Sequence, residues 1–374
     1  MTRTRWGLIL LLFLAGLLAA MQFAKLSLTL EDAAAIWPDR PVAFLVSAVS
    51  IVGAVFGAVA GAVVARFGAR PAILWAVGLS GALSLMQAAL PPFAVMIVLR
   101  ALEGAGHLAL VVALPTLMAA SAAPRDRTVV MGLWGTFFGV GFMAAAFALD
   151  ASASLGPSSP YWLHGVACLL LLPVLIRVVP RITVQGVPLP GIVALHRSIY
   201  TRARTIAPGV GHGIYTSLFI ALVALLPMAL DRLWLVAVLP ASNLFGTFVA
   251  GVLGRVVAPR RIVAGGYVAA GAGFFLLALG VGPVAAIAVL SLFATGLLAG
   301  GNFAAVPALN DDPADQALAN GGMAQLGNVG TFAGTPLLGA AFAAGGPTAM
   351  LAAVAGLCAV GAIVSATLYR RAAR

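Results

Sequence analysis

Residues 51–70 read IVGAVFGAVAGAVVARFGAR, an apolar run that ends in two arginines, Arg66 and Arg70. The run begins near residue 42, so a helix built from it is long enough to cross the ~30 Å hydrocarbon core of a bilayer. The rest of the chain has the same character: 62% of its 374 residues are hydrophobic, 8% are charged and the mean hydropathy is +1.10. Soluble domains keep a charged surface, so this composition indicates an integral membrane protein.

Similar apolar runs recur along the chain, separated by short breaks rich in Pro, Gly and Arg. They predict an all-α fold with 12 transmembrane helices. The first run resembles a signal peptide, but its removal would leave an odd number of spans, so we expect it to be retained. The expected spans cover residues 6–26, 42–64, 71–90, 93–120, 129–149, 160–179, 207–229, 233–256, 261–280, 284–306, 320–343 and 347–369.

The basic residues indicate how the chain is oriented. Of the 21 Lys and Arg residues, 17 fall in six segments that would share one side of the membrane with the N-terminus. Loops rich in Lys and Arg stay on the cytoplasmic side, so we expect a multi-pass protein of a bacterial inner membrane with both termini cytoplasmic. The net charge of +11 is divided among separate loops, which predicts contact with the lipid bilayer and no nucleic-acid partner.

The long basic segment 180–206 divides the chain into two halves. We expect an N-terminal six-helix bundle over 1–179, a cytoplasmic linker over 180–206 and a C-terminal six-helix bundle over 207–374. Two related bundles facing a shared cavity are typical of transporters. Three residues of the first half have counterparts 192 residues later: Gly104 and Gly296, Pro115 and Pro307, and Gly135 and Gly327.

The opening stretch resembles a loop signature of the major facilitator superfamily, Gly-x-Leu-x-Asp-Arg-x-Gly-Arg-Arg. Ala65 replaces the aspartate of that signature, which puts the charge contacts of this loop in doubt. The fourth span, Arg100-Ala-Leu-Glu-Gly-Ala-Gly106, is similar to the Arg-x-x-Gln-Gly-x-Gly pattern of the family, and the glycines of 132–141 resemble its fifth-span signature. The resemblance implies two pseudo-symmetric bundles, transport by alternating access and a conformational role for the matching loop residues, Gly61, Arg66, Gly68 and Arg70.

Two finer features bear on the branch and the direction of transport. A nearer likeness is to the cyanate and nitroimidazole permease branch of the superfamily. The fifth span has Gly135-Thr136 where antiporters of the family typically have Gly-Pro. The resemblance therefore favours uptake by symport over drug export.

Buried charge on the fourth span is the best candidate for a functional site. Arg100, Glu103 and His107 stand at i, i+3 and i+7, so they share one helical face. Counted from Phe93 at ~1.5 Å per residue, they lie about 11, 15 and 21 Å deep. Because charge in a membrane is costly, we expect Arg100 to bind an anionic substrate group, Glu103 to carry a proton and His107 to relay it. The alternative is an internal Arg100–Glu103 pair that only fixes the helix.

Other polar residues in the predicted spans are candidates to complete a central site. His212, on the equivalent helix of the second half, is a second candidate for proton coupling. Lys25 is expected to reach the membrane surface with its long side chain rather than contact substrate. Each neutral group has helix packing as its alternative role. The expected substrate-binding residues, besides Arg100, are Gln22, Trp134, Tyr215, Asn243 and Asn328.

The predicted function is secondary active transport of a small anionic or zwitterionic solute, coupled to protons. The chain has no Walker phosphate-binding loop, so ATP is not expected to drive it, and no cofactor or metal site is predicted. The main alternative is a proton-driven exporter of drugs or metabolites. An intramembrane enzyme or a sensor is less favoured, because the sequence lacks His-Glu-x-x-His and Gly-x-Ser-x-Gly motifs. A monomer is the expected state.

Overall fold

The computed structural model describes residues 3–181, 189 and 191–373, and within these ranges it is all-helical. Two short 3₁₀ turns lie in the first half: Pro124–Asp126 comes just before the helix that starts at Arg127, and Ala153–Leu155 just after the helix that ends at Ala151. The helices are α1 (Trp6–Ser27), α2 (Leu30–Ile36), α3 (Ala43–Phe67), α4 (Ala69–Gln87), α5 (Phe93–Ala120), α6 (Arg127–Gly135), α7 (Phe137–Ala151), α8 (Ser159–Val178), α9 (Ile192–Tyr200), α10 (Ala203–Ala229), α11 (Leu235–Leu253), α12 (Pro259–Ala278), α13 (Val284–Leu309) and α14 (Pro313–Ala372).

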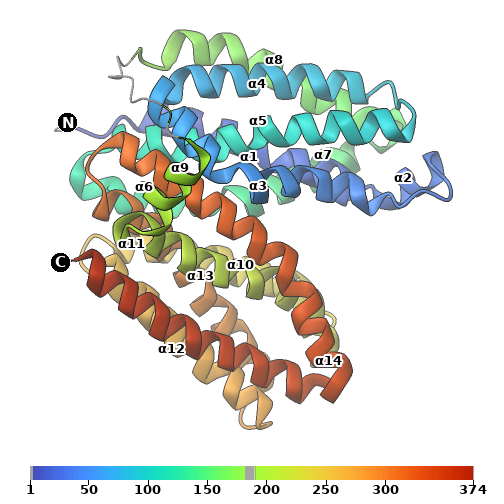
Figure 1. The fold of residues 1–374 in the computed structure, drawn as a ribbon. Helices are drawn as coiled ribbons and strands as arrows, with labels where there is room; N and C mark the ends of the chain where they lie inside the picture. Colours follow the sequence, from blue (N-terminus) through green and yellow to red (C-terminus); the bar gives the residue numbers. More distant parts are fainter. Residues whose placement is uncertain (1–2, 182–188, 190, 374) are drawn as a thin grey trace.

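The long helices agree with the predicted spans. Among the described residues, 10 helices are long and apolar enough to cross a membrane, or 11 if the α6–α7 pair, bent by 43°, forms one span. The 60-residue α14 reverses direction at Gly345 and Gly346 (Figure 1), where the backbone leaves helical geometry. Gly346 has φ +67°, which only glycine adopts readily. The two halves of α14 correspond to the last two predicted spans, and the count of 12 crossings stays a prediction.

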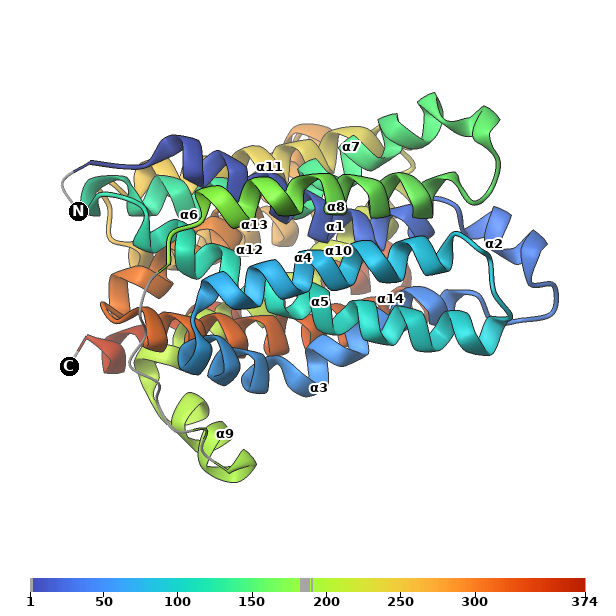
Figure 2. The same ribbon diagram turned by 90° about the horizontal axis from the view of Figure 1, so that it is seen from above.

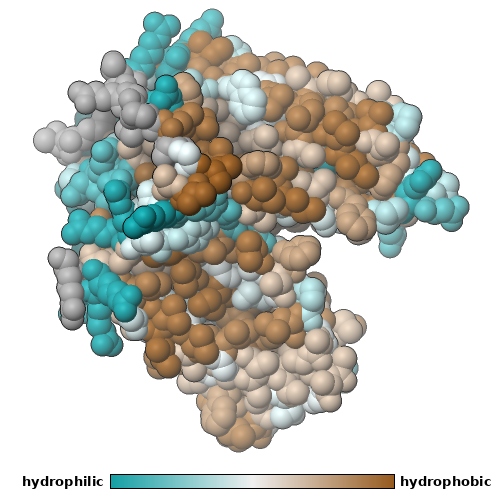
Figure 3. Space-filling model, viewed as in Figure 1, coloured by the Kyte–Doolittle hydropathy of each residue, from teal (hydrophilic) through white to brown (hydrophobic). Residues whose placement is uncertain are grey.

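The helices gather into two bundles, each with its own core. One hydrophobic cluster is drawn almost entirely from residues up to Val179, whereas the second runs from Ala207 to Tyr369. The bundles meet near the chain termini and diverge toward the opposite end (Figure 1). Figure 3 shows the wedge-shaped cleft that this leaves between them. We call the end with both termini the closed end and the opposite one the open end.

Glycines allow the two bundles to approach closely toward the closed end. A Cβ on Gly57 of α3 would lie 2.5 Å from Gln325 Cβ of α14, and one on Gly132 of α6 would lie 2.6 Å from Gly251 Cα of α11. Small residues permit such backbone contact between helices in lipid. The spacing Gly53, Gly57 and Gly61 therefore marks the face of α3 that packs on the other half.

Two short helices lie outside the predicted spans. α2 follows α1 at the open end, and α9 lies within the segment predicted as a linker, of which 182–188 and 190 lie outside the described residues. α10 also begins at Ala203, four residues before the predicted start at 207. The linker thus contains ordered helix, which a Pro- and Gly-rich segment did not indicate.

Candidate functional site

Glu103 is the centre of a buried polar cluster inside the N-terminal bundle. Its Oε1 lies 2.7 Å from Lys25 Nζ of α1, and its Oε2 lies 2.6 Å from Arg100 Nη1, one turn earlier on α5. Gln87 of α4 donates from Nε2 to the same Oε2 at 2.9 Å. The side chains of Lys25, Arg100 and Glu103 are at most 3% exposed. We call the Glu103 cluster the side chains of Lys25, Ser84, Gln87, Arg100, Glu103 and His164.

Ser84 links Lys25 to His164 of α8. Its Oγ lies 2.7 Å from Lys25 Nζ, 2.8 Å from Tyr161 O and 3.1 Å from His164 Nδ1, while His164 Nε2 lies 3.0 Å from Leu18 O. A carbonyl only accepts, so His164 Nε2 carries a hydrogen, and the single hydroxyl hydrogen of Ser84 points to Tyr161 O. The Nδ1 contact is then a hydrogen bond only when Nδ1 also carries a hydrogen.

The cluster contains more positive than negative charge. Lys25 and Arg100 face a single carboxylate, and His164 Nδ1 lies 4.0 Å from its Oε1. Arg100 also donates to Leu45 O at 3.0 Å and to Gln22 O at 2.8 Å, yet its Nη2 has no partner among the described residues. Charge buried in this way responds strongly to any further charge or proton, because the surroundings screen it little.

The three residues predicted to share one face of α5, Arg100, Glu103 and His107, have different surroundings. We call them the α5 stripe. Arg100 and Glu103 are fully buried, form an ion pair with each other and point toward α1, α3 and α4. Substrate contact by Arg100 stays a prediction. His107 is 7% exposed; its Nδ1 lies 3.0 Å from Ala19 O and its ring packs edge-on against Phe23. His107 is thus the member of the stripe nearest to a surface.

Lys25, which we expected to reach the membrane surface, is 2% exposed and bound to Glu103. That expectation was wrong, because the depth of a residue along a helix does not say which way its side chain points. His164, Ser84 and Gln87 were not identified from the sequence. The signal that could have found them is a polar residue within an apolar span: His164 in the sixth predicted span, and Ser84 and Gln87 in the third.

The remaining candidates are distributed over three places. Gln22 donates to Ser80 Oγ at 2.7 Å beside the Glu103 cluster, and Trp134 is fully buried, stacked 4.3 Å from Phe137. Tyr215 donates to Asn243 Oδ1 at 2.9 Å inside the C-terminal bundle, separate from that cluster. The other two are His212, which packs against Phe303 and has a buried Nδ1 without a described partner, and Asn328, which lies against Gly53 between the halves.

The loop of the opening stretch acts mainly within its own bundle. Gly68 has φ +87°, which allows the tight turn from α3 to α4. Arg70 donates to Val179 O at 3.0 Å and to Ile176 O at 2.9 Å, so it caps the end of α8. Arg66 lies over the ring of Phe67, 5.4 Å from its centroid. Gly61 packs on α14, where a Cβ would lie 2.8 Å from Ala317 O.

A charge contact across the halves comes from another loop. Arg255, which follows α11, lies 2.7 Å from Asp126 Oδ1, and Thr4 donates to Asp126 Oδ2 at 2.6 Å. The hydrogen bond from Thr4 lowers the pKa of Asp126, helped by Arg255 and Arg125. The carboxylate is therefore charged at neutral pH and holds the closed end together. We call Thr4, Asp126 and Arg255 the closed-end latch; the sequence pattern did not identify it.

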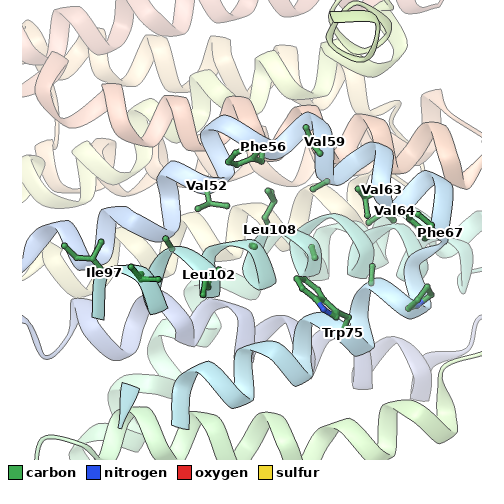
Figure 4. A pocket seen from close by; sticks show the side chains of 17 residues that line it. Val52, Phe56, Val59, Val63, Val64, Phe67, Trp75, Ile97, Leu102 and Leu108 are labelled. Carbon is green, nitrogen blue, oxygen red and sulfur yellow. The ribbon is translucent and has the colours of Figure 1, made fainter. Parts of the chain in front are cut away.

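An apolar cavity lies away from the Glu103 cluster, on the outside of the N-terminal bundle. It is a groove of about 680 Å³ between α3, α4 and α5, and every residue that lines it is nonpolar apart from the indole nitrogen of Trp75 (Figure 4). Phe56, Phe67 and Trp75 at its rim are 50%, 56% and 57% exposed. Such a surface suits lipid acyl chains and offers no group to orient a polar solute.

Solved structures of similar fold were identified for nearly the whole chain. The human organic anion transporter MFSD10 (TETRAN) superposes with a TM-score of 0.77, at 16% identity, over 96% of this chain and 98% of its own. The E. coli fucose:proton symporter FucP gives 0.75 at 16% identity over 98% and 99%. The proton:xylose symporter XylE gives 0.74 at 16% identity over 96% and 94%. At these identities the likeness shows the fold.

The sequence itself identifies the family. No curated protein matches it significantly. The family model described as Major Facilitator Superfamily matches residues 8–233, which is more than half of the chain. Together with the two helical bundles and the cleft between them, this match shows that the chain belongs to the Major Facilitator Superfamily.

Proposed function

We propose that this transporter takes up a small anionic or zwitterionic solute together with protons, by alternating access. The observation that carries the proposal is the Glu103 cluster: two cations share one carboxylate, all buried on helices of the first bundle. Intramembrane ionisable residues are costly and usually serve transport. Substrate contact by Arg100 and proton transfer by Glu103, His107 and His212 are parts of this proposal.

The orientation follows from the distribution of charge. The closed end carries both chain termini and most of the basic loops, and Figure 3 shows hydrophilic residues gathered there. Under the positive-inside rule this end is cytoplasmic, which supports placement in a bacterial inner membrane. The cleft then opens to the outside, so the structure represents a state ready to accept solute from there.

Protonation of Glu103 explains how proton and anion would move together. The carboxylate balances Lys25 and Arg100 at 2.7 and 2.6 Å, so its neutralisation leaves two buried cations without a counter-ion. An anionic solute in the cleft would restore the balance. In this proposal His107, one turn beyond Glu103 on the same helix and 7% exposed, passes the proton between cluster and cleft.

The relatives of similar fold support this reading without deciding it. Two of them carry the names of proton symporters, FucP and XylE, and a third is an organic anion transporter. Coupling to protons and transport of anions therefore both occur on this fold.

An exporter is the second candidate, because of the α6–α7 bend. The two helices meet at 43° around Thr136, whose hydroxyl donates to Leu133 O at 2.7 Å. This is the position where antiporters of the family typically have Gly-Pro, so the chain has a comparable break without the proline. The observation weakens the argument for uptake that the missing proline provided.

The first experiment identifies the solute. Purified protein is screened by thermal shift against small organic anions, amino acids, sugars and cationic drugs, since a ligand of the folded state raises the melting temperature. Hits are then tested for uptake into proteoliposomes with an inward or an outward proton gradient. Uptake of an anion that follows the inward gradient supports the proposal. Cationic hits driven by the outward gradient would establish the exporter instead.

A further inference from the structure

The α9 helix has an apolar face that the protein covers only in part. Leu195 and Ile199, four residues apart, are 3% and 0% exposed and pack against Ala58 and Ala62 of α3. Near the start of the helix, Ile192 and Val193 are 66% and 80% exposed. Figure 2 shows α9 projecting sideways from the bundles near the closed end. Ile192 continues the face of Leu195 and Ile199, whereas Val193 lies about 100° further around the helix. Both are exposed apolar side chains at the end of α9 that does not pack on α3.

α9 packs on α3 close to the end of that helix at the closed end. Ala62 and Ala58 lie 5 and 9 residues before Phe67, the last residue of α3, which is about 8 and 14 Å along the helix. Amphipathic helices at a membrane surface bury their apolar face about 5–10 Å into the boundary between headgroups and acyl chains. α9 also contacts the C-terminal bundle, because Tyr200 donates to Gln325 Oε1 at 2.8 Å and Thr205 to Ile199 O at 2.7 Å.

A basic cavity adjoins the C-terminal end of α9. It has a volume of about 210 Å³, and its polar lining comes from the start of α10, the end of α13 and both ends of α14. Arg202, Arg204 and Arg371 line the cavity together with one carboxylate, Asp315. Among these four described residues the only ion pair is Arg202–Asp315, which is long at 3.9 Å and exposed. Guanidinium groups bind phosphate oxygens in a fixed, two-pronged geometry. The residues lining this cavity are Arg202, Ala203, Arg204, Thr205, Asn310, Asp315, Arg371 and Ala372.

We propose that α9 and this cavity form a docking site for anionic phospholipid. Ile192 and Val193 enter the acyl region, and Arg202, Arg204 and Arg371 hold the headgroup phosphate. The cytoplasmic leaflet is the negatively charged one, and each basic residue near it contributes to attraction. The site rests on the proposed orientation, in which the closed end is cytoplasmic.

Fluorescence quenching tests the apolar part of the site. Full-length Val193→Cys is labelled with a polarity-sensitive fluorophore; the native Cys168 and Cys358 are buried and stay unlabelled. Val256→Cys is the matched control, because Val256 is 84% exposed at the same end but lies in the loop after α11. In vesicles whose lipids carry a quencher near the headgroup, we expect quenching at position 193 and little at 256. Equal, water-like emission at both positions would overturn the proposal.

The basic part is tested by lipid preference. Quencher-bearing phosphatidylglycerol should outcompete phosphatidylcholine at position 193, and Arg204→Gln or Arg371→Gln should each lower that preference about fivefold. Arg260→Gln, exposed at the same end but outside the cavity, should leave it unchanged. If Arg204→Gln instead abolishes thermal stabilisation by inorganic phosphate and leaves lipid preference intact, the cavity serves a soluble anion and the lipid assignment fails. Quenching reports lipid contact whichever way the protein faces, so failure of the transport proposal would be seen separately.

Discussion

Replacing each member of the Lys25–Glu103–Arg100 triad should have a different and ordered effect on stability. Glu103→Gln leaves two cations, which are 3% and 0% exposed, without a counter-ion. Removing one partner of a buried ion pair costs about 3–5 kcal/mol, because the remaining charge is uncompensated. Lys25→Met leaves Arg100 and Gln87 on the carboxylate and balances the charge, so we expect a loss of only about 1–2 kcal/mol.

The double variant is the sharper test. Glu103→Gln with Lys25→Met removes one charge of each sign, so the cluster keeps the net charge of the native protein. Contacting residues usually show coupling energies of about 0.5–3 kcal/mol. The double variant should therefore be more stable than Glu103→Gln alone.

Thermal unfolding in detergent measures these differences. A unit of about 150–250 residues, the size of one bundle, shifts its melting temperature by roughly 2–4 °C per kcal/mol. Glu103→Gln should thus melt about 6–20 °C lower than the native protein. Glu31→Gln, the same change at an exposed residue of α2, is the control and should not alter the melting temperature. A Lys25→Met variant less stable than Glu103→Gln, or fully additive effects, would refute the charge-balance reasoning.

Three further perturbations probe the second bundle and the seam, by which we mean the contact between the two bundles at the closed end. Asp126→Asn should loosen the closed-end latch. The reporter is Thr116→Cys, because Thr116 is 4% exposed and bonded across the halves to Asn320 at 3.0 Å; Asp126→Asn should raise the rate at which this cysteine is alkylated. Because Thr4 and Arg255 lower the pKa of Asp126, the latch contributes stability above the ordinary aspartate pKa of ~3.9 and loses it as the pH falls through the lowered value. The thiolate is the form that reacts, so alkylation itself becomes faster as the pH rises. The ratio of the rates with and without Asp126→Asn should nevertheless stay constant between about pH 5 and 8, and a ratio that changes in that window would contradict the assignment. Gly57→Ala places a Cβ 2.5 Å from Gln325 Cβ and 2.7 Å from its backbone nitrogen, so it should cost about 1–3 kcal/mol in thermal unfolding, whereas Gly339→Ala, with no atom within 4 Å, should be neutral; equal effects would mean that the seam is not tight. Tyr215→Phe removes the 2.9 Å bond to Asn243 and should lower unfolding free energy by about 1–3 kcal/mol, and an unchanged melting temperature would show that this contact adds nothing.

The positions of the spans were predictable because bilayer thickness fixes their length. The fourth span, expected at 93–120, is Phe93–Ala120 in the structure. Its polar face was predictable from helical periodicity, because Arg100, Glu103 and His107 stand at i, i+3 and i+7.

The partners of those residues were not predictable from one sequence. The rotation of α1 against α5 decides that Lys25 meets Glu103 instead of reaching the surface, and periodicity within α1 carries no information about it. The latch joins Asp126 to Arg255 across 129 residues, with no spacing rule to connect them. α9 was missed because nine helical residues lie in a segment whose prolines and glycines indicate an irregular linker.

Proton flux driven by the transported solute tests the central claim most directly. Proteoliposomes containing the native protein, Glu103→Gln or Glu31→Gln are loaded with a pH-sensitive dye, and the solute found in the screen is added outside without an imposed gradient. The native protein and Glu31→Gln should acidify the lumen as solute enters. Glu103→Gln should give no acidification while still exchanging labelled for unlabelled solute. Acidification by Glu103→Gln at the native rate would show that protons move by another route and would contradict the role assigned to the Glu103 cluster.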